Sequence, residues 1–160
     1  MELLEVFRDL VEEVPHRLRD ISADRASRKP APGKWSPKEE LGHLLDSAAN
    51  NHQRIVRIQL EGVSAMPGYA QEQWVALHRY QDRDWNELIE LWRALNVQLL
   101  SAAEAAKTEH HVRSCSVGGS APLTLSFIFD DYVRHMLHHL EHVGVNMEGL
   151  HLPPGVEARK

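Results

Sequence analysis

Four of the chain's eleven histidines lie within nine consecutive residues, "HMLHHLEHV", at positions 135 to 143. Imidazole is well suited to bind a transition metal or to transfer a proton near neutral pH. His135 and His139 are four residues apart, so on a helix both rings project from one face and can share one ion. The same spacing relates His138 and His142, which we interpret as exposed rim residues, with proton transfer or a weak second metal site as alternatives.

This cluster falls on a segment that is predicted to be helical from about Thr124 to near Gly149. At about 100° per residue, His139 lies about 50° and His135 about 90° from the centre of the apolar stripe, and the other two histidines lie further out. His135 and His139 are therefore the pair predicted to face the interior. The competing interpretation is that amphipathic imidazoles merely border the core. The stripe consists of Leu125, Tyr132, Met136, Leu140, Val143 and Met147.

A catalytic site of the zinc type needs about three protein ligands and one open position, so a third ligand must come from another helix. His43 and His52, on the segment that follows Ser36, are the candidates. Helical periodicity alone favours His52, because His52 lies within the apolar stripe of this segment whereas His43 points well away from it. That stripe consists of Leu41, Leu45, Ala48 and Ile55.

Four amphipathic segments are predicted to form the helices that position these side chains. The first extends from Leu3 to Ile21, and Pro15 is expected to bend or interrupt it. The second begins at Ser36, with proline next and a Ser-x-x-Glu capping box completed by Glu39. The third begins at Asp84, and the fourth carries the histidine cluster.

These segments predict an all-α fold, a four-helix bundle formed as a single domain by residues 1–160. A long crossover connection is expected between the second and third helices, because residues 62–80 begin as a Gly/Pro-rich loop. A short helix in that stretch, containing Trp74, is expected to act as a lid. Residues 108–122 are predicted to be a loop, and no segment has a convincing strand pattern.

Composition excludes several classes of protein. The formal net charge is −5 and no basic run offers a track for phosphates, so we expect no nucleic-acid partner. Cys115 is the single cysteine, which excludes an intrachain disulfide and agrees with a reducing compartment; we interpret it as incidental to function. With no secretory signal and no apolar stretch of about 18 residues, we expect a cytoplasmic protein that does not contact membranes.

Three stretches together resemble a known family. "GKWSPKEELGHLLDS", "DWNELIELWRALNVQLL" and "LSFIFDDYVRHMLHHLEHV" are similar to segments of the DinB-like (DinB/YfiT-like) superfamily of metal-binding four-helix bundles. The resemblance covers most of the chain and implies that His43, His135 and His139 bind a divalent metal, zinc or nickel. For His43 this conflicts with periodicity; we follow the resemblance, and His52 is the fallback. Asp131, one turn before His135, is a candidate for orienting that ring.

The resemblance also implies a class of reaction. Members of the family include thiol S-transferases and isomerases that use low-molecular-weight thiols, and three neutral imidazoles leave a divalent ion positively charged with an open position. We therefore expect metal-dependent hydrolysis or thiol transfer on a small molecule, such as a low-molecular-weight thiol, by a homodimer.

Two alternatives compete with this expectation. A di-iron carboxylate bundle would use Glu40-x-x-His43 and Glu13-x-x-His16, although the second pair faces away from the first helix's stripe. A non-catalytic, stress-related dimer that binds metal is the other alternative.

Overall fold

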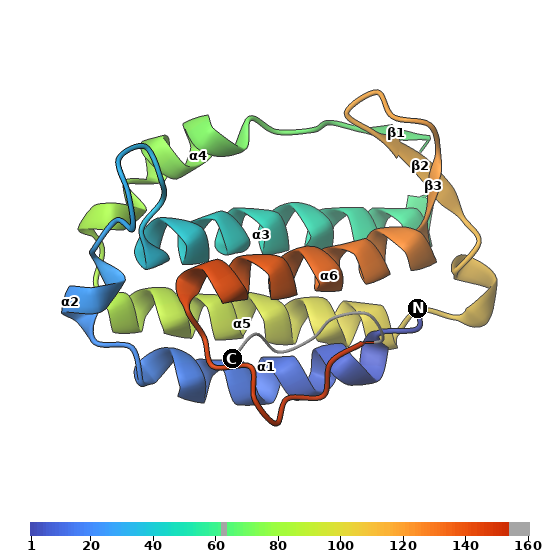
Figure 1. The fold of residues 1–160 in the computed structure, drawn as a ribbon. Helices are drawn as coiled ribbons and strands as arrows, with labels where there is room; N and C mark the ends of the chain where they lie inside the picture. Colours follow the sequence, from blue (N-terminus) through green and yellow to red (C-terminus); the bar gives the residue numbers. More distant parts are fainter. Residues whose placement is uncertain (62–63, 154–160) are drawn as a thin grey trace.

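The long helices lie side by side and form a bundle (Figure 1). The computed structural model describes residues 1–61 and 64–153. The bundle consists of α1 (Leu4–Arg19), α3 (Pro37–Glu61), α5 (Trp85–Glu104) and α6 (Leu125–Val143). The predicted all-α bundle is therefore confirmed. The connections contain α2 (Ala23–Ala26), α4 (Gln71–His78) and two 3₁₀ helices, η1 (Tyr80–Asp82) and η2 (Thr108–His110).

The chain direction explains the long connection between α3 and α5. The colours of Figure 1 show that these two helices run in the same direction, whereas α1 and α6 run in the opposite one. A chain that leaves the end of α3 must return along the whole helix before α5 can begin. The return path carries α4, the short helix predicted in this stretch, which packs against α3.

Side-chain caps define the starts of three of the long helices. Ser36 and Glu39 form the predicted capping box: the Glu39 amide donates to Ser36 Oγ (3.3 Å), and the Ser36 amide donates to Glu39 Oε2 (2.8 Å). The Asp84 side chain accepts from the Glu87 amide at the start of α5. Thr124 caps α6 in the same way.

Two helix features differ from the sequence prediction. Of the two effects expected of Pro15, an interruption does not occur, because α1 is helical from Leu4 to Arg19. Helix α6 does not reach Gly149 but ends at Val143, because Gly144 has a left-handed conformation (φ +85°) that closes the helix. The apolar pattern continues past this point because Met147, which lies in the irregular segment after the helix, is also buried.

A small sheet is present where none was predicted. It joins β1 (Ala65–Met66), β2 (Ser114–Val117) and β3 (Leu123–Thr124) in the order β1-β2-β3, with β1 parallel and β3 antiparallel to β2. The stretch predicted to be a loop thus contains β2. Strands of two to four residues carry too few side chains to show an alternating pattern.

The core lies between the long helices and is built around large aromatic side chains. Phe7 of α1 makes edge-to-face contacts with Phe129 and Tyr132 of α6. Helix α3 contacts α5, α6, α4 and η1, so every residue from 41 to 48 is buried. A helix that is covered on nearly all sides can bury polar side chains, and His43 is one of them. Of the described helices, none is long and apolar enough to cross a bilayer.

Candidate metal centre

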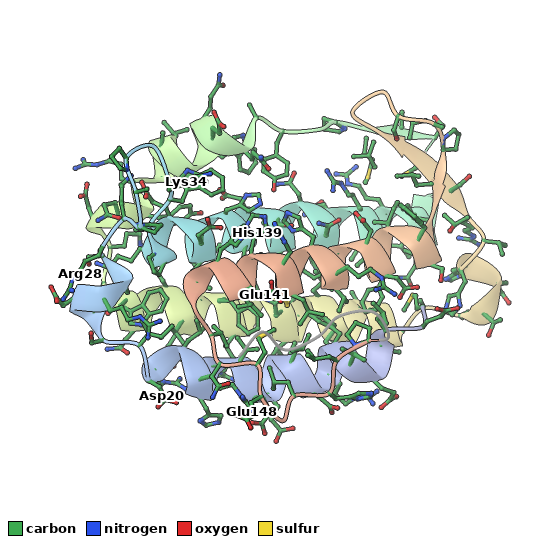
Figure 2. The ribbon with its side chains drawn as sticks, in the orientation of Figure 1. Asp20, Arg28, Lys34, His139, Glu141 and Glu148 are labelled. Atoms are coloured by element: carbon green, nitrogen blue, oxygen red, sulfur yellow. The ribbon has the colours of Figure 1, made fainter. Side chains whose placement is uncertain are left out.

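The three histidines implied by the family resemblance converge between α3 and α6. His43 is completely buried, and His135 and His139 are half-buried. One ring nitrogen from each lies within 4.8 Å of the others, and the Nε2 atoms of His43 and His135 are 3.1 Å apart. Figure 2 shows His139 between α3 and α6. The structure therefore brings together residues that are far apart in the sequence.

This geometry fits a divalent metal. Two imidazole nitrogens bound to one tetrahedral zinc ion, each at about 2.0–2.1 Å, would lie about 3.3 Å apart. The observed separation of 3.1 Å between His43 Nε2 and His135 Nε2 is close to this value. Neither His43 Nδ1 nor His135 Nδ1 has a hydrogen-bond partner in residues 1–61 and 64–153. No other side chain or backbone group of these residues therefore holds the two rings through Nδ1.

Electrostatics keep the buried rings neutral, which is the form that binds metal. Burial, together with the positive charges that His139 and His135 would carry, lowers the pKa of His43 to about 3. Burial and the charges that His139 and His138 would carry lower the pKa of His135 to about 4. At neutral pH no proton has to leave either ring before a cation binds.

Glu40 is the carboxylate that orients the cluster. Its Oε2 atom accepts a hydrogen bond from His139 Nδ1 at 2.7 Å. When Nδ1 carries the proton, the lone pair of His139 is on Nε2, so this bond selects the tautomer that can bind metal through Nε2. Glu40 is itself buried on α3, one turn before His43. From the sequence, Glu40 is a candidate only as a di-iron ligand; its i, i+3 spacing to His43 is the one local signal of this role.

The other predicted contributors lie at the edge of the cluster. His142 is exposed, and its Nδ1 is 3.6 Å from Glu40 Oε1, so Glu40, His139 and His142 form a second group with metal-ligating atoms. His138 is exposed and contacts the His142 ring (4.4 Å between centroids). Asp131 is exposed, and the structure shows no hydrogen bond from it to His135. The carboxylate beside the cluster is that of Glu40.

Packing fixes the position of His43. Trp35 covers its ring, with 5.2 Å between the ring centroids. Gly42 lets Tyr80 pack directly on α3, because a Cβ at Gly42 would lie 2.1 Å from the Tyr80 ring. In the "GH" pair, His43 is therefore a candidate metal ligand, and Gly42 leaves the space that the Tyr80 ring occupies.

Helical periodicity was misleading for the third position. His43 is completely buried, whereas His52, the residue that periodicity favoured, is only half-buried and belongs to neither metal-ligating group of the described residues. The di-iron alternative is not supported either, because Glu13 and His16 are exposed on α1, away from the cluster. Cys115 is buried in β2 and is in neither group.

A polar network surrounds Asp46, one turn after His43. The buried carboxylate accepts from Tyr80 Oη (2.7 Å), and its Oδ1 atom is 3.0 Å from His78 Nδ1. Burial raises the pKa of Asp46, and these two partners oppose the shift. Asn50 donates to the Asp46 carbonyl. The network attaches α4 and η1 to α3 beside the histidines.

A pocket of about 200 Å³ opens beside the cluster. His135 lines it from α6, and polar side chains of α3 line the opposite side. The other lining residues are Ser47, Asn51 and Arg54 of α3, Asp131 and Tyr132 of α6, Tyr69 from the segment before α4, and Gln71 at the start of α4. A small molecule in this pocket would be in contact with His135.

Comparisons with known proteins agree with this architecture. YfiT from Bacillus subtilis, described as a probable metal-dependent hydrolase with an unusual four-helix bundle topology, has a TM-score of 0.78 and 21% identity over 90% of this chain and 85% of that one. A DinB-like protein from the same organism, YjoA, has a TM-score of 0.63 and 18% identity over 90% and 87% of the two chains. At these identities the likeness shows the fold. Comparison with curated proteins gives no match. A sequence model of the DinB superfamily matches residues 5–143, and with a match over most of its length the chain belongs to that superfamily.

Proposed function

We propose that this protein is a divalent-metal-dependent hydrolase of small molecules, with His43, His135 and His139 as the metal ligands. The observation that carries the proposal is the convergence of three imidazoles within 4.8 Å, two of them kept neutral by burial. Imidazole ligands suit zinc and nickel, the two metals that we favour. The description of YfiT as a probable metal-dependent hydrolase supports the choice of reaction.

A divalent ion on three neutral ligands supplies a Lewis acid that lowers the pKa of bound water and polarises an electrophile. The chain's own residues prepare the site for this chemistry. Glu40 holds the His139 ring through Nδ1, and the Trp35 ring packs against the His43 ring. His135 faces the neighbouring pocket, through which a substrate can approach. A low-molecular-weight thiol could replace water as nucleophile, and thiol transfer is therefore the second reaction to assay.

The test begins with metal content. We would purify the chain without a polyhistidine tag, load it with zinc or nickel, remove excess ion, and measure bound metal by elemental mass spectrometry. We expect about one equivalent in the wild type and in His52→Ala, and a loss of binding in His43→Ala and His135→Ala. His52 is the matched control because it lies on the same helix as His43 but outside the cluster.

The loaded protein would then be assayed with panels of esters and amides, with and without added thiol. Hydrolysis that disappears in His43→Ala and persists in His52→Ala supports the proposal. Turnover that requires the thiol would reassign the site to thiol transfer. Wild-type protein that binds no metal, or that binds metal and converts none of the substrates, would contradict the hydrolase and favour a non-catalytic role.

A further inference from the structure

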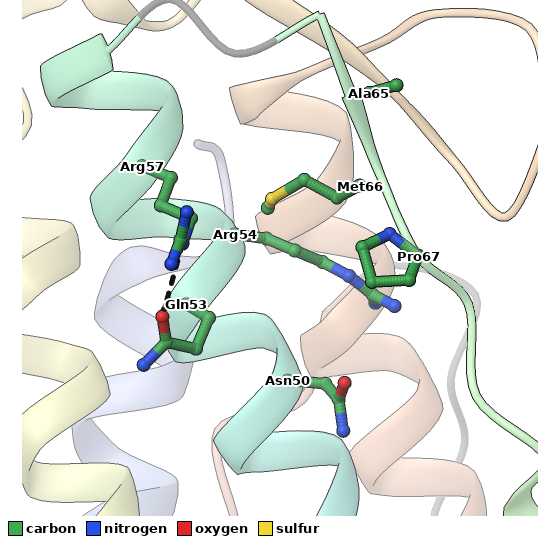
Figure 3. Close-up of a pocket in the computed structure, with 7 residues that line it drawn as sticks. All are labelled: Asn50, Gln53, Arg54, Arg57, Ala65, Met66 and Pro67. Atoms are coloured by element: carbon green, nitrogen blue, oxygen red, sulfur yellow. Dashed lines mark hydrogen bonds between the residues drawn. The ribbon is translucent and has the colours of Figure 1, made fainter.

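Arg54 occupies a distinctive place in the groove between α3 and α6. Its side chain lines the pocket that contains His135 and two neighbouring pockets as well. Figure 3 shows it extending from α3 toward Pro67, between Met66 and Asn50. Arg54 is eleven residues after His43, close to three full helical turns, so both residues lie on the same face of α3.

The positive charge of Arg54 lacks a direct partner. Its guanidinium donates one hydrogen bond, to Asn51 Oδ1 at 3.1 Å, and makes no ion pair with any residue in the described parts of the chain. The side chain is half-buried, and burial lowers its pKa, while the negative charges that Tyr69, Cys115 and Asp131 can carry oppose this shift. A guanidinium has five N–H donors, so most of them are available to a ligand.

Removing a cation from water is costly unless an anion or several acceptors compensate it. Several exposed arginines of this chain, such as Arg19, Arg28 and Arg79, have a carboxylate within ion-pair distance. Arg54 is more buried than these and has none. The pocket beside it therefore presents a partly desolvated cation, which favours an anionic group of a ligand, although the Asp131 carboxylate lines the same pocket and offsets part of that charge.

The same pocket connects this charge to the candidate metal centre. His135 and Arg54 both line the pocket of about 200 Å³. Asn51 of α3 and Tyr69, from the segment before α4, line it as well. This volume is below the range of about 300–1,000 Å³ that is usual for drug-sized ligands, so the ligand must be small. A molecule that places an acidic group on Arg54 would extend toward His135.

We propose that Arg54 binds a carboxylate of the substrate and so directs the reacting group of a small carboxylic acid toward the histidine cluster. This inference rests on the proposed function and names its substrate class: small esters or amides that carry a free carboxylate. A single guanidinium presents a planar fork that matches a carboxylate through two parallel hydrogen bonds. Asp131 at the pocket wall would repel a dianion such as phosphate more strongly than a monoanion.

The test uses the metal-free protein, so that no anion can bind through the metal. Benzoate, its neutral isostere benzamide and inorganic phosphate would be titrated into isotopically labelled protein in the presence of EDTA and followed by NMR. We expect benzoate to bind, with its largest shifts at Asn51 and Tyr69, and about tenfold weaker binding in Arg54→Gln. Benzamide should bind much more weakly than benzoate.

Arg57→Gln is the matched control. Arg57 lies on the same helix and donates to Gln53 (Figure 3), but it does not line the pocket of His135. Its replacement should leave benzoate affinity unchanged. Equal benzoate affinity in wild type and Arg54→Gln, equal binding of benzamide, or tighter binding of phosphate would each overturn the proposal. Circular dichroism of Arg54→Gln shows whether the fold is kept. Arg54→Lys, a second variant, keeps the positive charge but removes the planar guanidinium.

This experiment can fail independently of the proposed function. Benzoate binding by a wild-type protein that takes up no zinc or nickel would support the carboxylate site and leave the hydrolase contradicted. Metal binding and hydrolysis of neutral esters without any effect of Arg54→Gln would support the hydrolase and overturn the carboxylate site.

Discussion

His43 Nε2 and His135 Nε2 lie 3.1 Å apart, although 92 residues separate them in the chain. One ring comes from α3 and the other from α6, so the contact exists only when these two helices pack against each other. The candidate metal centre therefore forms only in the folded bundle. Substitution of its histidines reports on the packing of α3 against α6 as well as on metal binding.

Glu40 should control metal affinity through His139. Replacing Glu40 by glutamine keeps the shape but removes the charge that favours the Nδ1–H form of His139. We expect the dissociation constant for zinc to increase by about 10- to 100-fold. Competition with a chelating indicator would measure it. Asp131→Asn is the control, because Asp131 makes no hydrogen bond to His135; an equal loss in both variants would contradict the assignment to Glu40.

Metal-free protein should lose stability as the pH decreases from neutral. Below pH 6.5 the unfolded chain protonates its histidines, whereas burial lowers the pKa of folded His43 to about 3 and of His135 to about 4. The unfolded state then binds more protons, so the free energy of unfolding decreases as the pH falls. For His43 we expect a loss of ~2 kcal/mol between pH 6.5 and about pH 5, and a smaller one for half-buried His135.

Urea unfolding in EDTA at several pH values would measure this dependence. The curve should be flatter in His43→Gln, which removes the group that the unfolded state protonates. Parallel curves for the two proteins would show that the burial of His43 does not set the acid sensitivity.

Gly42 should be required for the contact with Tyr80. Alanine in place of glycine within a helix normally stabilises a protein, but here the new Cβ would lie 2.1 Å from the Tyr80 ring. We expect Gly42→Ala to destabilise the fold by about 1–3 kcal/mol, or more if the ring cannot move. In a Tyr80→Ala background the same substitution should be neutral or stabilising. A double-mutant cycle from thermal unfolding measures this coupling, and additive effects would refute it.

A buried hydrogen bond between α5 and α6 should contribute to stability. Tyr132 Oη donates to Asn96 Oδ1, and both side chains are buried. Tyr132→Phe leaves that oxygen without its partner in the core, which costs about 1–3 kcal/mol. Tyr69→Phe, at a half-buried position beside the groove, should have a smaller effect because water can reach the site. Chemical denaturation of both variants tests the order, and the reverse order would contradict it.

The sequence by itself determined the local features of the protein. The i, i+4 spacing brought His135 and His139 onto one face of α6, and the capping box at Ser36 located the start of α3. These features depend on residues within one or two helical turns, so their pattern is visible without the fold. Gly144 is also a typical signal for the end of a helix, but the apolar pattern that continues to Met147 favoured a longer helix.

Only the tertiary structure decided which side chains meet. Periodicity placed His43 away from the apolar stripe of its helix, yet α3 is covered by α4, α5, α6 and η1, so a polar position became an interior one. The hydrogen bond between Glu40 and His139, and the pocket shared by Arg54 and His135, likewise join different helices. A periodic pattern reports the average burial of one face of one helix, whereas a site depends on which faces the neighbouring helices cover.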